Sequence, residues 1–274
     1  MSMPAPWKLR KPTTDPIPVL VTVPHCGTAF PTDLQPPVAA SHQRDCPDTD
    51  WFVHELVAFT PDLGAPLLTA HWHRYVVDLN RDPAGKALYH DGRPETGPVP
   101  LRTFNGQPVY AGEQPGEEEV RSRVRRFHAP WYHKVGEILG DLQNRHGRVI
   151  LFDVHSIRRH VPAIRPGPFP DVILSNANDT AADPELFSAV CATADRVRGL
   201  PIARNHPFRG GFQTRHWGDP AAGIHAIQVE MSQDTYMDEQ ENRLIEDKAT
   251  KVRDLLRAML TTMKTWSAKE NPSR

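Results

Sequence analysis

The stretch VILFDVHS, residues 149–156, decides the fold. Its first part is a short apolar run rich in β-branched residues, which is typical of a strand covered on both faces. Asp153 and His155 stand at alternate positions near its end, so both point to the same side of an extended chain. The stretch therefore predicts a buried strand that ends in chemically active side chains.

Four further runs of the same kind predict additional strands, and helical patterns lie between them. The other runs cover 19–23, 75–79, 172–174 and 224–229. Apolar residues at helical spacing cover about 51–59, 117–142 with a kink expected at Pro130, 183–199, and about 238–266. Strands that alternate with helices predict an α/β fold with a mainly parallel sheet.

The composition is typical of an ordinary soluble globular protein and argues against several classes of partner. Of 274 residues, 39% are hydrophobic and 24% charged, with a net charge of −1, so no basic surplus favours nucleic acid or an anionic membrane as partner. No run of roughly 20 apolar residues suggests a membrane span, and the N-terminus lacks the apolar run of a signal peptide. Three scattered cysteines are too few for a disulfide framework. We therefore expect a cytoplasmic enzyme.

Long irregular loops are a second expectation from the composition. The 28 prolines are concentrated before residue 116 and between 160 and 220. Proline stiffens loops and interrupts regular elements. The loop 82–116 is too long to be a plain connection, so we expect it to cover or build a site.

Polar residues follow the predicted strands at the edge where ligands bind in an open α/β sheet. They are His25 after 19–23, Asn80 and Arg81 after 75–79, His155 after 149–154, and Glu230 after 224–229. None of these is a residue that the end of a strand needs for stability. We expect them to converge on one edge of the sheet.

Two histidines with a nearby carboxylate favour a metal site. A single histidine after a strand is more often a hydrogen-bonded loop residue, but neutral imidazole and carboxylate together suit zinc with three protein ligands. Asp153 either orients the imidazole of His155 or caps a neighbouring helix. Glu230 is either a reactive carboxylate or the ion-pair partner of Arg81 or Arg209.

The third ligand is open between acidic residues. Asp45, Asp48 and Asp50 crowd the stretch before the predicted helix at 51–59. Helix capping and a favourable helix dipole explain at least one of them. A carboxylate at a helix start can also face the His25 end of the sheet.

Six segments carry a resemblance to a known family. They are VTVPHCGTAFP (21–31), DTDWFVHEL (48–56), RYVVDLNRDP (74–83), LFDVHSI (151–157), FRGGFQTRHWG (208–218) and HAIQVEMSQDTYMDE (225–239). In this order they resemble the N-formylglutamate amidohydrolases, also called N-formylglutamate deformylases. That family is similar to the zinc carboxypeptidases and to the acylases of succinylglutamate and acetylaspartate. The resemblance implies one three-layer domain over 1–274, zinc-carboxypeptidase-like, with a mixed, mainly parallel sheet and a loop insertion at 82–116.

The resemblance also implies roles for individual residues. The metal ligands would be His25, His155 and an acidic residue. Thr28 stands where the larger group places its acidic ligand, so Asp50 is expected instead, with Asp48 as the alternative. Glu230 fits the general base of the group.

An anionic substrate follows from the same comparison. Asn80 and Arg81 match a pair that grips a substrate carboxylate, and Arg74, Arg209 or Arg215 would hold a second one, since guanidinium groups bind carboxylates at two points. The implied reaction is zinc-dependent hydrolysis of N-formyl-L-glutamate to L-glutamate and formate, as in histidine degradation. The small-molecule partner is then an acidic N-acyl amino acid.

Three alternatives remain. One is a related zinc acylase or carboxypeptidase acting on another N-acyl acidic amino acid. The second is a thiol hydrolase that uses Cys26, although adjacent residues of an extended chain point to opposite sides and leave His25 poorly placed as its base. The third is a binding protein for acidic ligands that has no turnover.

Overall fold

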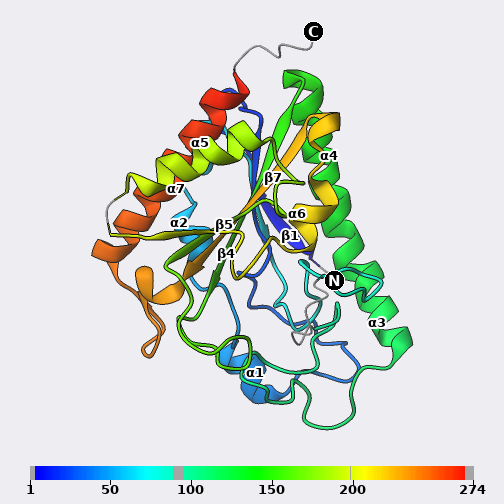
Figure 1. The fold of residues 1–274 in the computed structure, drawn as a ribbon. Helices are drawn as coiled ribbons and strands as arrows, with labels where there is room; N and C mark the ends of the chain where they lie inside the picture. The colour runs from blue at the N-terminus through cyan, green and yellow to red at the C-terminus, as the bar shows by residue number, and fades with distance from the viewer. Residues whose placement is uncertain (1–3, 89–95, 198, 269–274) are drawn as a thin grey trace.

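A mixed sheet forms the centre of the computed structural model, which describes residues 4–88, 96–197 and 199–268 (Figure 1). Its strands within these ranges are β1 (Trp7–Arg10), β2 (Val19–Val23), β3 (Leu67–Ala70), β4 (Val149–Ile157), β5 (Val172–Ser175), β6 (Ile202–Arg204) and β7 (Ile224–Ser232). The order across the sheet is β1-β3-β2-β4-β7-β5-β6. The pairs β1–β3 and β5–β7 are antiparallel, and the other pairs are parallel. The predicted α/β class with a mixed, mainly parallel sheet is confirmed.

Helices cover both faces of this sheet and complete three layers (Figure 1). They are α1 (Ala40–Asp45), α2 (Val53–Leu56), α3 (Glu117–Arg123), α4 (Ala129–His146), α5 (Pro184–Asp195), α6 (Phe212–Trp217) and α7 (Glu246–Ser267). Apolar residues of α2, α5 and α7 form one core with inward side chains of β2, β4 and β7. Apolar residues of α4 form a second core on the opposite face, and Trp217 of α6 packs against it. Because both faces are covered, all residues of β2 and β4 are buried.

Local sequence signals explain where the elements begin and end. The side chain of Asp183 accepts hydrogen bonds from the backbone of Glu185 and Leu186, and Pro184 occupies the first turn, so α5 starts where the sequence predicts. The helix α4 ends at Gly147, whose φ of 78° suits glycine.

The helix expected to kink at Pro130 contains a π-helical turn shortly before that proline. This turn, η2 (Val124–His128), joins α3 to α4. Proline has no N–H and its ring crowds the carbonyl four residues earlier, here that of Arg126. A widened turn accommodates both effects, and such turns are common at functional sites.

The predicted strand at 75–79 is wrong. These residues form buried turns, and Val76, Val77 and Leu79 pack in the core beneath α4. Their backbone groups form hydrogen bonds outside the sheet. The N–H of Val76 donates to the carbonyl of His73, and the N–H of Asp78 donates to the carbonyl of Pro98. The place beside β2 belongs to β3, so the apolar run is buried without joining the sheet.

Two predicted helices are shorter than expected. The segment 51–59 contains only α2, and a 3₁₀ turn, η1 (Thr60–Leu63), follows it. The last helix begins at Glu246 rather than near Asp238, because β8 (Met237–Asp238) pairs with β9 (Arg243–Leu244).

The long loop has little regular structure in its described part, 82–88 and 96–116. An isolated bridge joins Arg102 to Pro108 there. Among the described helices, none has both the length and the apolar character needed to cross a bilayer.

Candidate active site

Three buried side chains meet at the carboxyl edge of the sheet. His25 lies two residues after β2, Asp50 lies just before α2, and His155 lies on β4. His155 Nδ1 is 3.3 Å from Asp50 Oδ2 and 3.2 Å from His25 Nδ1. His25 Nδ1 is 3.8 Å from Asp50 Oδ2. One atom of each residue thus faces the others within 4.8 Å, which suits a single metal ion.

The fold brings these residues together through neighbouring parallel strands. Because β2 and β4 are paired in parallel, their ends deliver His25 and His155 to the same edge. A backbone hydrogen bond positions Asp50 beside His25: the N–H of Asp50 donates to the carbonyl of His25. Its Oδ2 accepts the backbone N–H of Ser156 at 3.1 Å.

The far nitrogen of each imidazole is held by a buried carboxylate. His25 Nε2 lies 2.8 Å from Asp78 Oδ1, and His155 Nε2 lies 2.8 Å from Asp153 Oδ2. A carboxylate accepts, so each Nε2 carries a hydrogen, and each Nδ1 faces the centre, where it would offer a lone pair to a bound metal ion. Metal-binding histidines are commonly oriented in this way, so the residues present fit a divalent metal. Of the two roles considered for Asp153, this contact fits the one in which it orients the imidazole of His155.

Burial and charge shift the titration of these groups. Burial lowers the pKa of His25, and the guanidinium of Arg74 adds to that effect. Burial acts in the same direction on His155, but Asp153 and Asp50 raise its pKa well above the usual value. Burial opposes the effect of Arg74 and His25 on Asp78, whose pKa they still hold well below its usual range.

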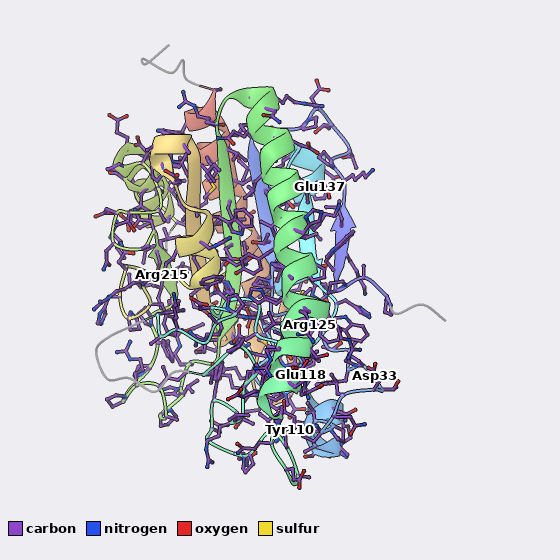
Figure 2. All side chains as sticks on the ribbon, turned by 90° about the vertical axis from the view of Figure 1, so that its right-hand side faces the viewer. Asp33, Tyr110, Glu118, Arg125, Glu137 and Arg215 are labelled. Atoms are coloured by element: carbon purple, nitrogen blue, oxygen red, sulfur yellow. The ribbon has the colours of Figure 1, made fainter. Side chains whose placement is uncertain are left out.

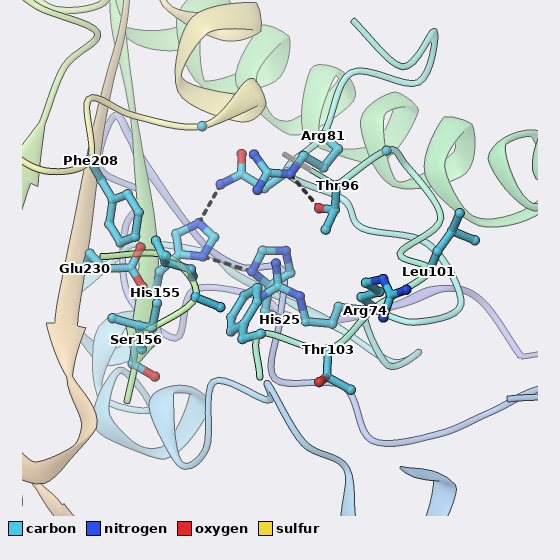
Figure 3. A pocket seen from close by; sticks show the side chains of 18 of the residues that line it. His25, Arg74, Arg81, Thr96, Leu101, Thr103, His155, Ser156, Phe208 and Glu230 are labelled. Carbon is cyan, nitrogen blue, oxygen red and sulfur yellow. Dashed lines mark hydrogen bonds between the residues drawn. The ribbon is translucent and has the colours of Figure 1, made fainter. Parts of the chain in front are cut away.

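Glu230 lies on β7 directly opposite His155 of β4 (Figure 3). Its Oε2 accepts a hydrogen bond from Gln228 Nε2 at 3.2 Å. Burial raises the pKa of Glu230 to about 8, and the positive charge of His155 offsets only part of that effect. A carboxyl group with such a pKa can exchange protons near neutral pH.

A cavity of about 520 Å³ opens onto these groups (Figure 3). Guanidinium groups of Arg74, Arg81 and Arg102 line it together with residues of the long loop. Arg74 pairs with Asp78 at 2.6 Å and lies 4.6 Å above the ring of Phe104. The cavity therefore suits an anionic ligand.

Asn80 is locked at the back of this cavity. Its Oδ1 accepts the backbone N–H of Gln213 at 2.9 Å, which turns its amide nitrogen toward His155, 3.3 Å away. Gly211 packs so closely that a Cβ there would lie 2.2 Å from the Asn80 amide. Only glycine leaves room for this side chain.

Arg81 lines the cavity as expected, although it does not follow a strand. Its Nε donates to Thr96 Oγ1 at 3.1 Å. Arg209 and Arg215 are exposed and are absent from the described lining, and Arg215 lies on the outer side of α6 (Figure 2).

Asp48, the alternative third ligand, has other partners. Its Oδ2 accepts hydrogen bonds from Tyr75 Oη at 2.6 Å and from Phe104 N at 2.7 Å. It thus ties the long loop to the body of the protein. Among the described residues, the group that could hold a metal ion contains Asp50 instead.

Cys26 is a poor nucleophile in this structure. Its thiol donates to the carbonyls of Val23 and Ala70. Burial raises its pKa to about 12, so little thiolate exists near neutral pH. The geometry disfavours the thiol hydrolase.

Several residues of the site escaped the sequence analysis. Asp78, Gln228, Arg102 and Phe104 were not singled out. Two of them had a usable signal, since Asp78 and Gln228 are polar residues within apolar runs and each stands two positions before a predicted site residue. The two loop residues had none.

Comparisons with known proteins identify the family of the chain. A profile of the N-formylglutamate amidohydrolase family matches residues 17–237. An N-formylglutamate deformylase of Pseudomonas putida is 36% identical over 254 residues, which cover 92% of this chain and 94% of that protein. A second, from Pseudomonas aeruginosa, is 38% identical over 258 residues, covering 91% and 94%.

The fold agrees as well. A crystal structure of N-formylglutamate amidohydrolase from Ralstonia eutropha JMP134 superposes with a TM-score of 0.80 at 26% identity, covering 95% of this chain and 98% of that chain. A protein of Agrobacterium tumefaciens at 17% identity has the same fold, with a TM-score of 0.72 and coverage of 95% and 97%. With most of its length matched in both sequence and structure, the chain belongs to the N-formylglutamate amidohydrolase family.

Proposed function

We propose that this protein hydrolyses the N-formyl amide of N-formyl-L-glutamate to L-glutamate and formate, with zinc held by His25, Asp50 and His155. The observation that carries the proposal is the convergence of these three side chains with Glu230 in a cavity lined by guanidinium groups. The names of the relatives in Pseudomonas support the same activity. A role in histidine degradation would follow from it.

In this proposal Glu230 transfers protons, and other residues of the site bind the metal and the substrate. A zinc ion at this site would supply Lewis-acid chemistry, which acidifies water and polarises a carbonyl. Glu230 takes the proton from the attacking water and delivers it to the leaving amine. Its raised pKa, about 8, suits both steps near neutral pH.

The arginines of the cavity bind the carboxylates of the substrate. Arg81 and Arg74 line the same cavity as Asn80, so two-point contacts with a dicarboxylate are available there. Arg209 and Arg215 are exposed, so we assign them the weaker role of attracting an anion toward the mouth.

Metal analysis combined with a formate-release assay tests the proposal. Purified protein is expected to contain close to one zinc per chain and to release formate from N-formyl-L-glutamate. N-acetyl- and N-succinyl-L-glutamate, assayed in parallel, should react more slowly. Faster release of either would reassign the protein to a related acylase, and binding without release would make it a binding protein.

Two substitutions sharpen the test. His25→Ala and His155→Ala should each lower the zinc content, and unchanged metal in either variant would contradict the assigned site. Cys26→Ser is the control and should retain activity, because the thiol takes no part.

A further inference from the structure

Three successive carbonyl groups beside the cavity are each held by a donor from outside the segment. Leu79 O accepts from Tyr132 Oη at 2.8 Å, and Asn80 O from the backbone N–H of Phe212 at 3.2 Å. Arg81 O lies 3.1 Å from His128 Nε2. Residues 79–81 are not paired with a strand of the sheet, so these three hydrogen bonds fix their backbone.

The chemistry of His128 fits a permanent donor. A carbonyl oxygen only accepts, so Nε2 must carry the hydrogen. The side chain is 3% exposed, and burial lowers its pKa to about 4, so the ring is neutral at ordinary pH. Its ring stacks on Tyr132 with 4.3 Å between centroids and 6° between planes.

The π-helical turn is what aims His128 at this carbonyl. His128 is the last residue of η2, directly before α4. A π-helical turn adds one residue to the helical register, which rotates the side chains that follow by roughly 100° relative to those before it. This places His128 and Tyr132, one α-helical turn apart, under the carbonyls of Arg81 and Leu79.

The opposite side of the segment is closed as tightly. Gly211 leaves no space between itself and the amide of Asn80. Phe212, the next residue, packs against Tyr132 with 5.5 Å between ring centroids. The segment is therefore clamped between the start of α6 and the junction of η2 with α4.

We infer that His128 is a positioning residue, which fixes the backbone of Arg81 so that its guanidinium meets a carboxylate of the substrate. The inference rests on the proposed function, in which Arg81 binds that carboxylate. His128 touches no reacting atom and acts through the peptide of Arg81. It should therefore affect how tightly the substrate binds rather than how fast the bound substrate reacts.

The variant His128→Phe isolates this role, because the phenyl ring keeps the stacking on Tyr132 and removes only the donor. We expect the KM for N-formyl-L-glutamate to rise roughly tenfold, the effect of one buried hydrogen bond, with kcat within about twofold. His128→Gln, which restores an amide donor, should recover part of the loss. His133→Phe is the matched control at an exposed neighbour and should change nothing.

A double-mutant cycle distinguishes positioning from general support of the fold. If His128 acts through Arg81, then His128→Phe should add little to the rise in KM already caused by Arg81→Ala. Independent, additive effects would overturn the inference, and so would a fall in kcat with unchanged KM.

A crystal structure of His128→Phe decides the matter without relying on the substrate. A displaced Arg81–Asp82 peptide, whose carbonyl His128 holds, supports the inference, and an unmoved one overturns it. Absence of formate release by the unaltered protein would instead refute the proposed function alone.

Discussion

The centre of the sheet and the irregular segment 73–81 fix their site residues in different ways. His155 and Glu230 lie on β4 and β7, where a continuous parallel ladder holds the backbone. Arg74, Asn80 and Arg81 lie on turns, and backbone and side-chain donors from other elements hold Asn80 and Arg81. Of the residues proposed to handle the metal and the proton, His155 and Glu230 stand on strands, and His25 follows β2 by two residues. Those proposed to bind the substrate stand on turns.

The difference teaches which part of the site tolerates change. A strand residue keeps its place while the ladder persists, because the register is set by many bonds. A residue on a turn depends on a few specific donors, so one substitution can move it. Substitutions near the sheet should therefore affect turnover, and substitutions near the turns should affect binding.

The largest effect should come from Glu230→Gln on β7. Glutamine keeps the shape but cannot take a proton, so kcat is expected to fall by roughly 10²- to 10⁴-fold. Zinc content and KM should stay close to their original values, as measured by elemental analysis and steady-state kinetics. Full turnover in this variant would remove Glu230 from the role of base.

Asp153 and Asp78 provide a matched pair from the two regions, since each holds the Nε2 of a proposed ligand. Asp153→Asn and Asp78→Asn should each weaken zinc binding by roughly 10- to 100-fold in competition with a chelator. Asp78 also pairs with Arg74, so its variant alone should raise KM. Equal KM values in the two variants would contradict the view that residues of the turn segment affect substrate binding more than residues of the strands.

Gly211→Ala tests the fit around Asn80. The added Cβ would lie 2.2 Å from the Asn80 amide, so that side chain or α6 must shift. Overpacking of this kind costs about 1–3 kcal/mol, and we expect KM to rise about tenfold with little loss of zinc. Gly116→Ala, at an open position, is the control. An unchanged KM would show that the packing around Asn80 is not needed for binding.

Acid should weaken the turn segment. Burial lowers the pKa of His73 to about 3 and that of His128 to about 4. Well above pH 6.5 both histidines are neutral in the folded and in the unfolded chain, so neither changes the free energy of unfolding. As the pH falls below 6.5, the unfolded chain binds protons that the folded chain excludes, so each lowers the free energy of unfolding by about 1 kcal/mol between pH 6.5 and 5.5.

Urea unfolding at pH 7.5, 6.5 and 5.5 measures this effect. The His128→Phe variant should lose about 1 kcal/mol less than the original protein over the acidic step. Amide hydrogen exchange should quicken in 73–81 before it quickens in β4. Identical pH dependence of the two proteins would contradict the prediction.

The difference between the strands and the segment 73–81 also explains which elements the sequence could predict. Runs such as 149–154 and 224–229 are mostly apolar because both faces of the sheet are covered, and their strands are confirmed. The run 75–79 has the same composition, since it is equally buried, yet its backbone bonds to other loops. Burial can be read from residue types, whereas the partner of a backbone group depends on segments far along the chain.

The same limit applies to the candidate site, where contacts between distant segments could not be predicted. His25 and His155 could be proposed because strand ends share one edge of a sheet, whereas Asp50 was expected from the family resemblance. The structure brings the three residues together. The roles of Phe104 and His128 depend on a long loop and on a π-helical turn, and no pattern in their neighbourhood encodes either contact. Asp78 lay within the misassigned strand, so its contact with His25 was also missed.

The direct pairing of His155 with Glu230 across β4 and β7 has an evolutionary consequence. Adjacent strands lie about 4.8 Å apart in any sheet, so the spacing between these two backbones is inherited with the fold itself. The opposite wall of the cavity comes from the long loop, whose residues can be exchanged without disturbing that spacing. Descendants of such a protein can acquire new substrates by altering the loop while the reaction chemistry is preserved.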